Sequence, residues 1–150
     1  MDRYDWAILE ALRQDGRKSW AKLAEELNLS ASSLQRRTQA MQENGIIRHF
    51  TVAVNNRAIG REVRAFVQVK INRHDPQAAE AFYHAIIHYP EVEACHKISG
   101  STDFMLNITA ANLAGFAQFL ENKILYLPGV MDASSSIVLQ DIKENGIAIK

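Results

Sequence analysis

The sequence has a single cysteine, only three prolines and no long apolar run. With Cys95 alone, the chain can form neither an internal disulfide nor a zinc site of several cysteines, which favours the reducing cytoplasm as its location. No apolar stretch approaches the roughly 20 residues that are needed to cross a bilayer, so we expect no membrane partner. The first residues, MDRYDW, are charged and helical in pattern, and they do not resemble a signal peptide.

The sequence also lacks an excess of either charge. Its 17 basic and 17 acidic side chains give a net charge of zero, whereas strong nucleic-acid binders usually carry an excess of lysine and arginine. Residues 1–60 hold nine basic and seven acidic side chains, a net charge of +2, and residues 61–150 hold eight and ten, a net charge of −2. Such a weak asymmetry predicts low DNA affinity per subunit, so we expect an oligomer in which several copies act together.

The signatures of common catalytic sites are missing as well. The sequence contains no P-loop, GxGxxG or GxSxG segment, so we predict no enzyme activity, no catalytic residue and no cofactor. His84 and His88 are four residues apart on an expected helix, but the acidic residue of an HExxH metal site is absent. Cys95 and His96 would point to opposite faces of an expected strand, which separates a nucleophile from its base. We therefore predict no metal site.

Three helical patterns occupy the first third of the chain. Apolar residues at helical spacing predict three helices, over residues 2–14, 19–28 and 30–44, each with a capping side chain at its start. The tight turn between the last two helices predicts a helix-turn-helix, with the first helix completing a small core. The two tryptophans, Trp6 and Trp20, are expected to pack in this core.

The helix over residues 30–44 has one apolar and one polar face. On a wheel of about 100 degrees per residue, the apolar face contains Leu34, Thr38 and Met41. The first turns of the polar face are the part of a recognition helix that meets base edges in the major groove. The candidate DNA-binding residues are Ser32, Ser33, Arg36 and Gln39 for bases, Arg37 on the flank for a phosphate, and Ser19 and Lys22 on the preceding helix. An ordinary solvated helix face is an equally open interpretation.

The periodicity changes from helical to alternating at residue 48. Alternating apolar residues predict a strand at the start of residues 48–61, and the turn residues after it mark a connection between two domains. Beyond this connection, the patterns predict the order strand, helix, strand, strand, helix, strand. The expected elements cover residues 63–71, 75–90, 92–99, 103–109, 112–125 and 130–142, and residues 146–150 are a candidate edge strand.

This order is that of a ferredoxin-like βαββαβ domain, in which one antiparallel sheet carries both helices on one face. The second helix of the domain is expected to bury Leu113, Phe116, Leu120 and Ile124. The other face of the sheet has no helix to cover it, so another copy of the chain would have to do so. The predicted fold class is therefore α+β, and the predicted assembly is an oligomer.

Two sets of residues carry a resemblance to a known family. In the first domain they are Asp2, Asp5, Ile8, Leu9, Leu12, Asp15, Gly16, Arg17, Ser19, Leu23, Ala24, Leu27, Leu29, Ser30, Arg37, Gly45 and Ile47. In the second domain they are Val92, Cys95, Gly100, Asp103, Phe104, Leu127, Pro128, Gly129 and Val130. No single motif is specific, but their order and spacing over nearly the whole chain resemble the Lrp/AsnC, or feast/famine, family of bacterial and archaeal transcription regulators.

The resemblance implies a particular domain organisation and assembly. It implies a winged helix-turn-helix-like three-helix domain over residues 1–47 and a strand or hinge linker over residues 48–61. A ferredoxin-like βαββαβ (RAM) domain over residues 62–150 would then bind an effector and assemble the protein. Double-stranded DNA and an amino acid effector are the implied partners, and the implied assembly is a sheet-paired homodimer that closes into an octamer.

The resemblance places the effector between dimers, near the turn from Gly100 to Asp103. Glycine permits a turn whose amides converge on a carboxylate, and an aspartate can accept an ammonium, so an amino acid would find both partners there. A glycine turn with a solvated aspartate is the alternative. Candidate effector-binding residues are Gly100, Ser101, Thr102 and Asp103, with Ser134 and Ser136 from a neighbouring subunit. Ser101 and Thr102 depart from the acidic and bulkier residues common in the family, and we expect leucine or methionine as effector.

The sequence thus predicts a cytoplasmic transcription regulator that responds to an amino acid. The proline often found at the start of the family's recognition helix is absent, so the base preference does not carry over. A rival from another class is a small-molecule-sensing module that modulates an enzyme by protein contact, which the neutral net charge favours. DNA affinity that falls steeply with salt distinguishes the regulator from this rival.

Overall fold

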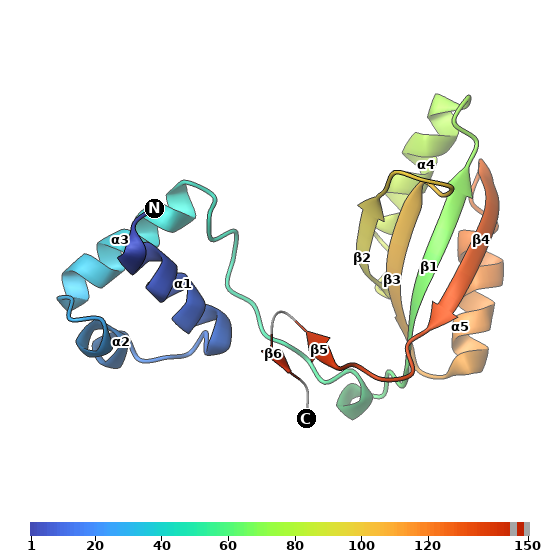
Figure 1. The fold of residues 1–150 in the computed structure, drawn as a ribbon. Helices are drawn as coiled ribbons and strands as arrows, with labels where there is room; N and C mark the ends of the chain where they lie inside the picture. The colour runs from blue at the N-terminus through green and yellow to red at the C-terminus, as the bar shows by residue number, and fades with distance from the viewer. Residues whose placement is uncertain (145–146, 149–150) are drawn as a thin grey trace. The chain divides into compact units, whose positions relative to one another are not determined.

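A computed structural model describes residues 1–144 and 147–148 of the chain (Figure 1). The chain forms two compact units. Met1–Val54, together with the described part of Ile142–Lys150, forms the first, and Asn55–Asp141 forms the second. Among the described residues, no helix has the length and apolarity that crossing a membrane requires.

The first unit contains the three predicted helices, α1 (Arg3–Gln14), α2 (Trp20–Glu26) and α3 (Ala31–Glu43). Asp2 caps α1 by accepting hydrogen bonds from the amides of Tyr4 and Asp5, and Ser30 caps α3 by accepting one from the amide of Ser33. Ser19 precedes α2, but its side chain makes no capping hydrogen bond, contrary to prediction. Asn28 adopts a left-handed conformation with φ of 52°, and this residue ends the turn after α2.

A small apolar core joins the three helices. Its fully enclosed residues are Ile8, Leu23, Ala24, Leu34 and Met41. Thr38 is also buried, and its hydroxyl donates to the carbonyl of Leu34 at 3.0 Å, so the predicted buried face of α3 is confirmed.

The packing expected of the two tryptophans is wrong for this chain, because Trp6 is 64% exposed and Trp20 is 44% exposed. Trp6 lies about 200° around α1 from Ile8, and Trp20 is the first residue of α2, beyond the end of the core.

The linker differs from its prediction. Residues 48–56 form no strand, and the first regular element after α3 is a short 3₁₀ helix, Arg57–Ile59. The apolar residues of the linker, Phe50, Val52 and Val54, are all exposed. Alternation alone predicted a strand here, but a strand also needs a neighbour to hydrogen-bond, and within the described residues none pairs with this segment.

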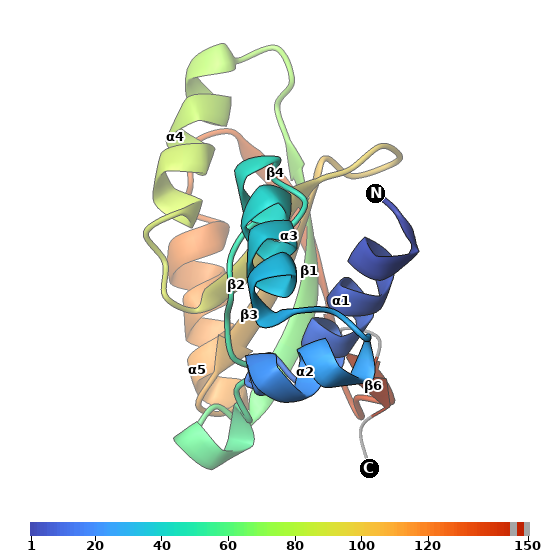
Figure 2. The ribbon, with the colours of Figure 1, turned by 90° about the vertical axis from the view of Figure 1, so that its left-hand side faces the viewer.

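The second unit is the predicted βαββαβ arrangement. Its elements are β1 (Val63–Ile71), α4 (Pro76–Ile86), β2 (Val92–Lys97), β3 (Phe104–Ala110), α5 (Leu113–Phe119), a π-helical turn (Leu120–Ile124) and β4 (Val130–Ile137). The four strands form one antiparallel sheet in the order β2-β3-β1-β4. Helices α4 and α5 lie on the same side of it (Figures 1 and 2). The ferredoxin-like fold is confirmed.

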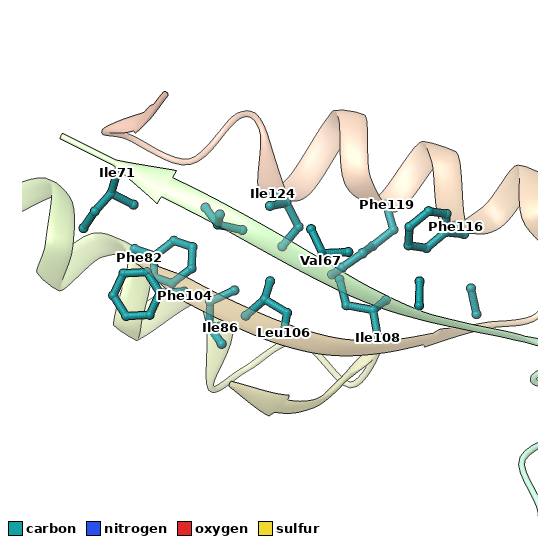
Figure 3. Packing of buried hydrophobic residues seen from close by; sticks show 13 residues of the cluster. Val67, Ile71, Phe82, Ile86, Phe104, Leu106, Ile108, Phe116, Phe119 and Ile124 are labelled. Atoms are coloured by element: carbon teal, nitrogen blue, oxygen red, sulfur yellow. The ribbon is translucent and has the colours of Figure 1, made fainter. Parts of the chain in front are cut away.

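The core of this unit lies between the sheet and its two helices (Figure 3). Phe82 of α4 stacks against Phe104 of β3 with ring centroids 4.7 Å apart, and α5 contributes Phe116 and Phe119. The predicted burial of Leu113 is wrong, because this first residue of α5 is 61% exposed. Phe119 is buried in its place.

The C-terminal end of the sheet is shorter than predicted. Strand β4 ends at Ile137, not near residue 142. A separate two-stranded sheet follows, in which β5 (Lys143–Glu144) pairs with β6 (Ile147–Ala148). The expected strand over residues 146–150 is therefore present only in part, and it is not an edge of the main sheet. Residues 146, 149 and 150 lie outside the described residues.

Candidate functional site

The turn between β2 and β3 brings the predicted effector residues to the end of the sheet. Its base is closed by two backbone hydrogen bonds, from the Ile98 amide to the Asp103 carbonyl and from the Asp103 amide to the Val69 carbonyl, both 2.9 Å. Gly100 has φ of 131°, a conformation that side-chain-bearing residues rarely adopt. Within the described part of the chain, the amides of residues 99–102 donate to no protein acceptor, so they are free to bind an anion.

Asp103 is a buried carboxylate at the foot of this turn. Its Oδ2 accepts from the Ile71 amide at 3.0 Å and its Oδ1 accepts from Arg73 Nε at 2.6 Å. The hydrogen bond from the Ile71 amide, followed by the contact with the Arg73 guanidinium, holds the pKa of the Asp103 carboxyl below its ordinary value of 3.8. The site therefore holds a fixed negative charge at neutral pH.

A cavity of about 500 Å³ opens beside this carboxylate, between the turn, the end of β1 and α4. Its apolar walls come from Ile71, Ala79, Tyr83, Ile98 and Phe104. The Tyr83 and Phe104 rings meet edge to face with centroids 5.6 Å apart. Figure 3 shows Ile71, Phe82 and Phe104 at one end of the sheet. Lys97, Arg73, Gly100 and Asp103 supply the polar groups. Apolar walls with a few charged groups suit a small zwitterion that has an apolar side chain.

A second hollow of about 420 Å³ lies on the other side of Arg73. It shares Ile71, Arg73 and Gly100 with the first cavity. Its further lining residues are Lys70, Asn72, His74, Ser101 and Met131. Lysine, arginine and histidine are therefore all among the residues that line this hollow.

The structure gathers some of the predicted effector residues and separates others. Gly100 and Asp103 line the larger cavity, and Ser101 lines the smaller one. Thr102 is half-buried and lines neither.

Ser134 and Ser136 pair with Gln68 and Phe66 on the helix-free face of the sheet and also line neither cavity. Their predicted contribution to a neighbouring subunit's pocket stays a prediction.

Sequence reasoning missed Arg73, Lys97 and Tyr83. The signal that could have identified Arg73 is the topology itself. In a βαββαβ sheet β1 and β3 are antiparallel neighbours, so the residues after β1 must lie beside the start of β3. Arg73 follows β1 by two residues and Asp103 precedes β3 by one. A cation close to this buried aspartate was therefore predictable.

The DNA-reading candidates lie on α3 as expected. Ser32, Arg36 and Gln39 are exposed, Ser33 is half-buried, and Ser19 and Lys22 are exposed at the start of α2. Gln39 Nε2 donates to Glu43 Oε1 at 2.9 Å, along the same exposed face. The helix thus presents a polar surface opposite its buried residues.

Arg37 has partners within the domain. Its Nη1 lies 2.8 Å from Asp2 Oδ2 and 2.7 Å from Asp5 Oδ1, and its guanidinium lies 5.5 Å from the centre of the Tyr4 ring. The hydrogen bonds of the Asp2–Asp5 capping box, together with Arg37, hold the pKa values of both aspartates below 3.8. Arg37 therefore ties α3 to the start of α1, and its predicted phosphate contact remains untested.

One ring of the histidine pair contacts the backbone of its own helix. His88 Nδ1 lies 2.6 Å from the backbone carbonyl of His84, so this ring bonds its own helix. Among the residues that the structure describes, no group of three or more histidine, cysteine, aspartate or glutamate side chains is placed to hold a metal ion.

Comparison with known proteins assigns both units. The profile of the AsnC-type helix-turn-helix domain matches residues 1–42, and that of the Lrp/AsnC ligand binding domain matches residues 64–148. The chain belongs to the Lrp/AsnC family of transcription regulators. The resemblance seen in the sequence is thereby confirmed, and α2 and α3 form the helix-turn-helix of this Lrp/AsnC regulator.

Relatives of this Lrp/AsnC regulator match over nearly its whole length. It is 35% identical over 147 residues to the proline dehydrogenase transcriptional activator of Rhizobium radiobacter, covering 98% of this chain and 94% of that protein. It is 30% identical to the leucine-responsive regulatory protein of Escherichia coli K12, covering 100% and 92%.

Solved structures agree with the sequence relatives. A transcriptional regulator from Neisseria meningitidis, crystallised as a complex with L-methionine, matches with a TM-score of 0.91 and 31% identity over 96% of this chain and 93% of that one. A feast or famine regulatory protein from Mycobacterium tuberculosis, complexed with L-methionine, matches with a TM-score of 0.84 and 25% identity over 95% of each chain.

Proposed function

We propose that this regulator reads DNA with the exposed face of α3 and responds to an apolar amino acid held at the turn between β2 and β3. The observation that carries the effector proposal is the juxtaposition of free amides, the buried Asp103 carboxylate and an apolar cavity of about 500 Å³. A zwitterion needs an anion partner, a cation partner and room for its side chain, and this one segment offers all three.

Methionine and leucine are the proposed effectors. The cavity walls are aliphatic and aromatic, which favours an apolar side chain of moderate size. Two similar solved structures are complexes with L-methionine, and a relative is named for its response to leucine. An effector can act only by binding one arrangement of the protein more tightly than another, so we infer that it alters assembly or the spacing of the readers.

We further propose a cytoplasmic homodimer that assembles into an octamer. The weak charge of the reading domain supports this proposal, because several linked readers are needed to raise a low individual affinity. A dimer would place its paired recognition helices in successive major grooves roughly 34 Å apart on a pseudo-palindromic site. As a regulator, the protein would act through DNA occupancy and not through catalysis.

The DNA proposal is tested by substituting Arg36, which is exposed on α3. The DNA probe is a fragment selected from a random pool by the wild-type protein. We expect Arg36→Ala to weaken binding to this fragment roughly tenfold or more, because one bidentate base contact is worth that much, and to weaken binding to random DNA less. Gel-shift titration over a range of salt concentrations measures both.

Arg17→Ala is the matched control, since Arg17 is exposed outside α3 and its loss removes the same charge. Equal effects of the two substitutions on selected and random DNA would contradict base reading by α3. No DNA retention by the wild-type protein at low salt would instead support the rival function, a sensing module that acts on an enzyme by protein contact.

A further inference from the structure

Asp103 needs a positively charged partner whether or not an effector is bound. Its side chain is 9% exposed, and both carboxylate oxygens already accept a hydrogen bond, one from the Ile71 amide and one from Arg73. A buried carboxylate that loses its cation is strongly destabilising. An effector ammonium can therefore bind Asp103 in one of two ways. It can replace Arg73, or it can donate a further hydrogen bond to a carboxylate oxygen that already accepts one.

Arg73 is the partner that can leave. Its side chain is 65% exposed, and it holds Asp103 through Nε alone. In the described part of the chain, Arg73 makes no other hydrogen bond or ion pair. Arg73 lines both the apolar cavity and the smaller hollow, so there is open space next to this residue. Releasing it exposes no buried group other than the carboxylate that the incoming ammonium would cover.

We propose that Arg73 is an exchangeable partner of Asp103 and the residue that selects amino acids over simple amines or acids; this rests on the proposed effector site. The effector ammonium takes the place of Arg73 Nε at Asp103 Oδ1. The released guanidinium then pairs with the effector carboxylate, together with the free amides of the turn. Every charge has a partner before and after the exchange, and guanidinium and carboxylate are complementary in shape.

The exchange explains why both ends of the ligand matter. An amine without a carboxylate must displace Arg73 while offering it no new partner. An acid without an amine leaves Arg73 on Asp103 and gains only the turn amides. Only a molecule that carries both an ammonium and a carboxylate gives Asp103 and Arg73 each a new partner in place of their ion pair. The ion pair therefore discriminates against simple amines and simple acids.

Calorimetry with Arg73→Gln tests the exchange. The probes are L-methionine and L-leucine, each compared with its decarboxylated amine, 3-(methylthio)propylamine or 3-methylbutylamine. We expect Arg73→Gln to weaken amino acid binding roughly tenfold, because a charge-assisted contact is lost, and to strengthen amine binding, because the competitor for Asp103 is gone. The preference for amino acid over amine should therefore fall by more than tenfold.

Lys97→Gln is the matched control, since Lys97 is a second cation of the same cavity that makes no contact with Asp103. Because Lys97→Gln removes a positive charge that does not compete for Asp103, it should raise amine affinity only slightly, and the preference for amino acid over amine should fall much less than with Arg73→Gln. Amino acid and amine affinities that change in parallel in Arg73→Gln would overturn the exchange alone. Binding of neither methionine nor leucine to the wild-type protein would overturn the proposed effector class as well.

A measurement on the wild-type protein keeps the proposal testable if Arg73→Gln does not fold. The side-chain Nε–H of Arg73, bonded to Asp103, should give a slowly exchanging NMR resonance. Saturation with methionine should shift this resonance, whereas the amine analogue at the same concentration should shift it less, because it binds more weakly and occupies fewer sites. A resonance that methionine leaves unchanged would overturn the exchange.

Discussion

Arg37 shows how the partners of a residue determine what it does. Its position on α3 suggested a phosphate contact, but its guanidinium bonds Asp2 and Asp5 at the start of α1. Because α3 carries the exposed residues Ser32 and Arg36, this cluster fixes the orientation of the reading surface on the rest of the domain. Among the described residues, the core of this domain contains only five buried apolar side chains, so the ion pairs of Arg37 with Asp2 and Asp5, a polar clamp, matter to its stability.

Substitutions in this clamp should lower both stability and DNA affinity. We expect Arg37→Met and Asp5→Asn each to lower the Tm of the protein by several degrees, and the double variant to lose less than the sum of the two, because the two side chains share the ion pair between them. Long-range electrostatics alone would make Asp5→Asn bind DNA more tightly, since a negative charge is lost. Loosening of α3 predicts weaker binding to selected DNA, which gel-shift titration measures. Arg36→Met, an exposed neighbour, should leave the Tm within about 1 °C.

The same clamp has a defined pH dependence. Asp2 and Asp5 have pKa values below their ordinary 3.8 in the folded chain, so their ionised forms stabilise the fold above that pH. This contribution is lost as the pH falls through the folded pKa values. The Tm difference between the wild-type protein and Asp5→Asn should therefore be constant from about pH 8 to 5 and shrink below about pH 4. A difference that persists at the acid end would show that the carboxylate charge is not what stabilises α3.

Single residues also mark the limit of prediction from sequence. Residue types and spacing were enough to select Gly100 and Asp103, which the structure places together at one cavity. They did not reveal that Arg73 bonds Asp103, because that contact joins residues 30 positions apart through the antiparallel pairing of β1 and β3. Ser134 was chosen by alternation alone, and within one chain it lies on the helix-free face of the sheet.

At the scale of elements, the turn before β4 controls how that strand meets α4. Gly129 has φ of +78°, and a Cβ added to it would lie 2.2 Å from the Cβ of Ala78, a buried residue of α4. The Gly129 carbonyl accepts from the Asn72 amide at 2.8 Å, which fixes the turn against the end of β1. The LPGV motif predicted a turn, but the close approach to α4 is visible only in the structure.

Gly129→Ala should therefore destabilise the second unit far more than an ordinary glycine replacement. We expect the free energy of unfolding to fall by about 2–5 kcal/mol, from left-handed backbone strain and overpacking against Ala78. Gly60→Ala is the matched control, because Gly60 has φ of +80° with nothing within 4 Å of its added Cβ. It should cost only about 1–2 kcal/mol. Urea unfolding followed by circular dichroism compares the two variants. Similar decreases in the free energy of unfolding would mean that α4 shifts to accommodate the added methyl group without a measurable penalty.

Elements with a strong period were predictable, and those that depend on distant partners were not. Strand β1 and helix α4 have the predicted extents within a few residues, because capping, proline and alternation are local signals. The linker has the alternation of a strand but no strand beside it in the described chain. In α5, a local pattern could not reveal the π-helical turn at Leu120–Ile124 or the exposure of the helix start.

For the whole molecule, the distribution of charge and apolar surface argues for assembly. The chain has no net charge, and its first 60 residues carry only +2, so one reading domain has little electrostatic attraction for DNA. Both helices of the second unit pack on the same face of its four-stranded sheet. On its other face Phe66 is 39% exposed, beside Arg64, whose guanidinium carbon lies 5.8 Å from the ring centre. The sequence predicts that a second copy of the chain covers this face.

Phe66→Glu should therefore dissociate the subunits and weaken DNA binding, although it does not change the DNA-binding domain. A carboxylate in place of the Phe66 ring removes apolar contact area and adds a charge that must lose its water at the contact, so the variant should have the mass of a monomer in sedimentation experiments at micromolar concentration. Its affinity for selected DNA should fall by roughly a hundredfold or more, because two linked readers bind far better than one.

Ile87→Glu is the control for this experiment, since it adds the same charge at an exposed apolar residue after α4, in the helical layer on the other side of the sheet. It should keep the oligomeric state of the wild-type protein and lose little DNA affinity. A dimeric Phe66→Glu variant with wild-type affinity would show that the copies meet elsewhere. A monomeric variant that still binds DNA tightly would show that one weakly charged reader is enough, and the argument from charge to assembly would fail.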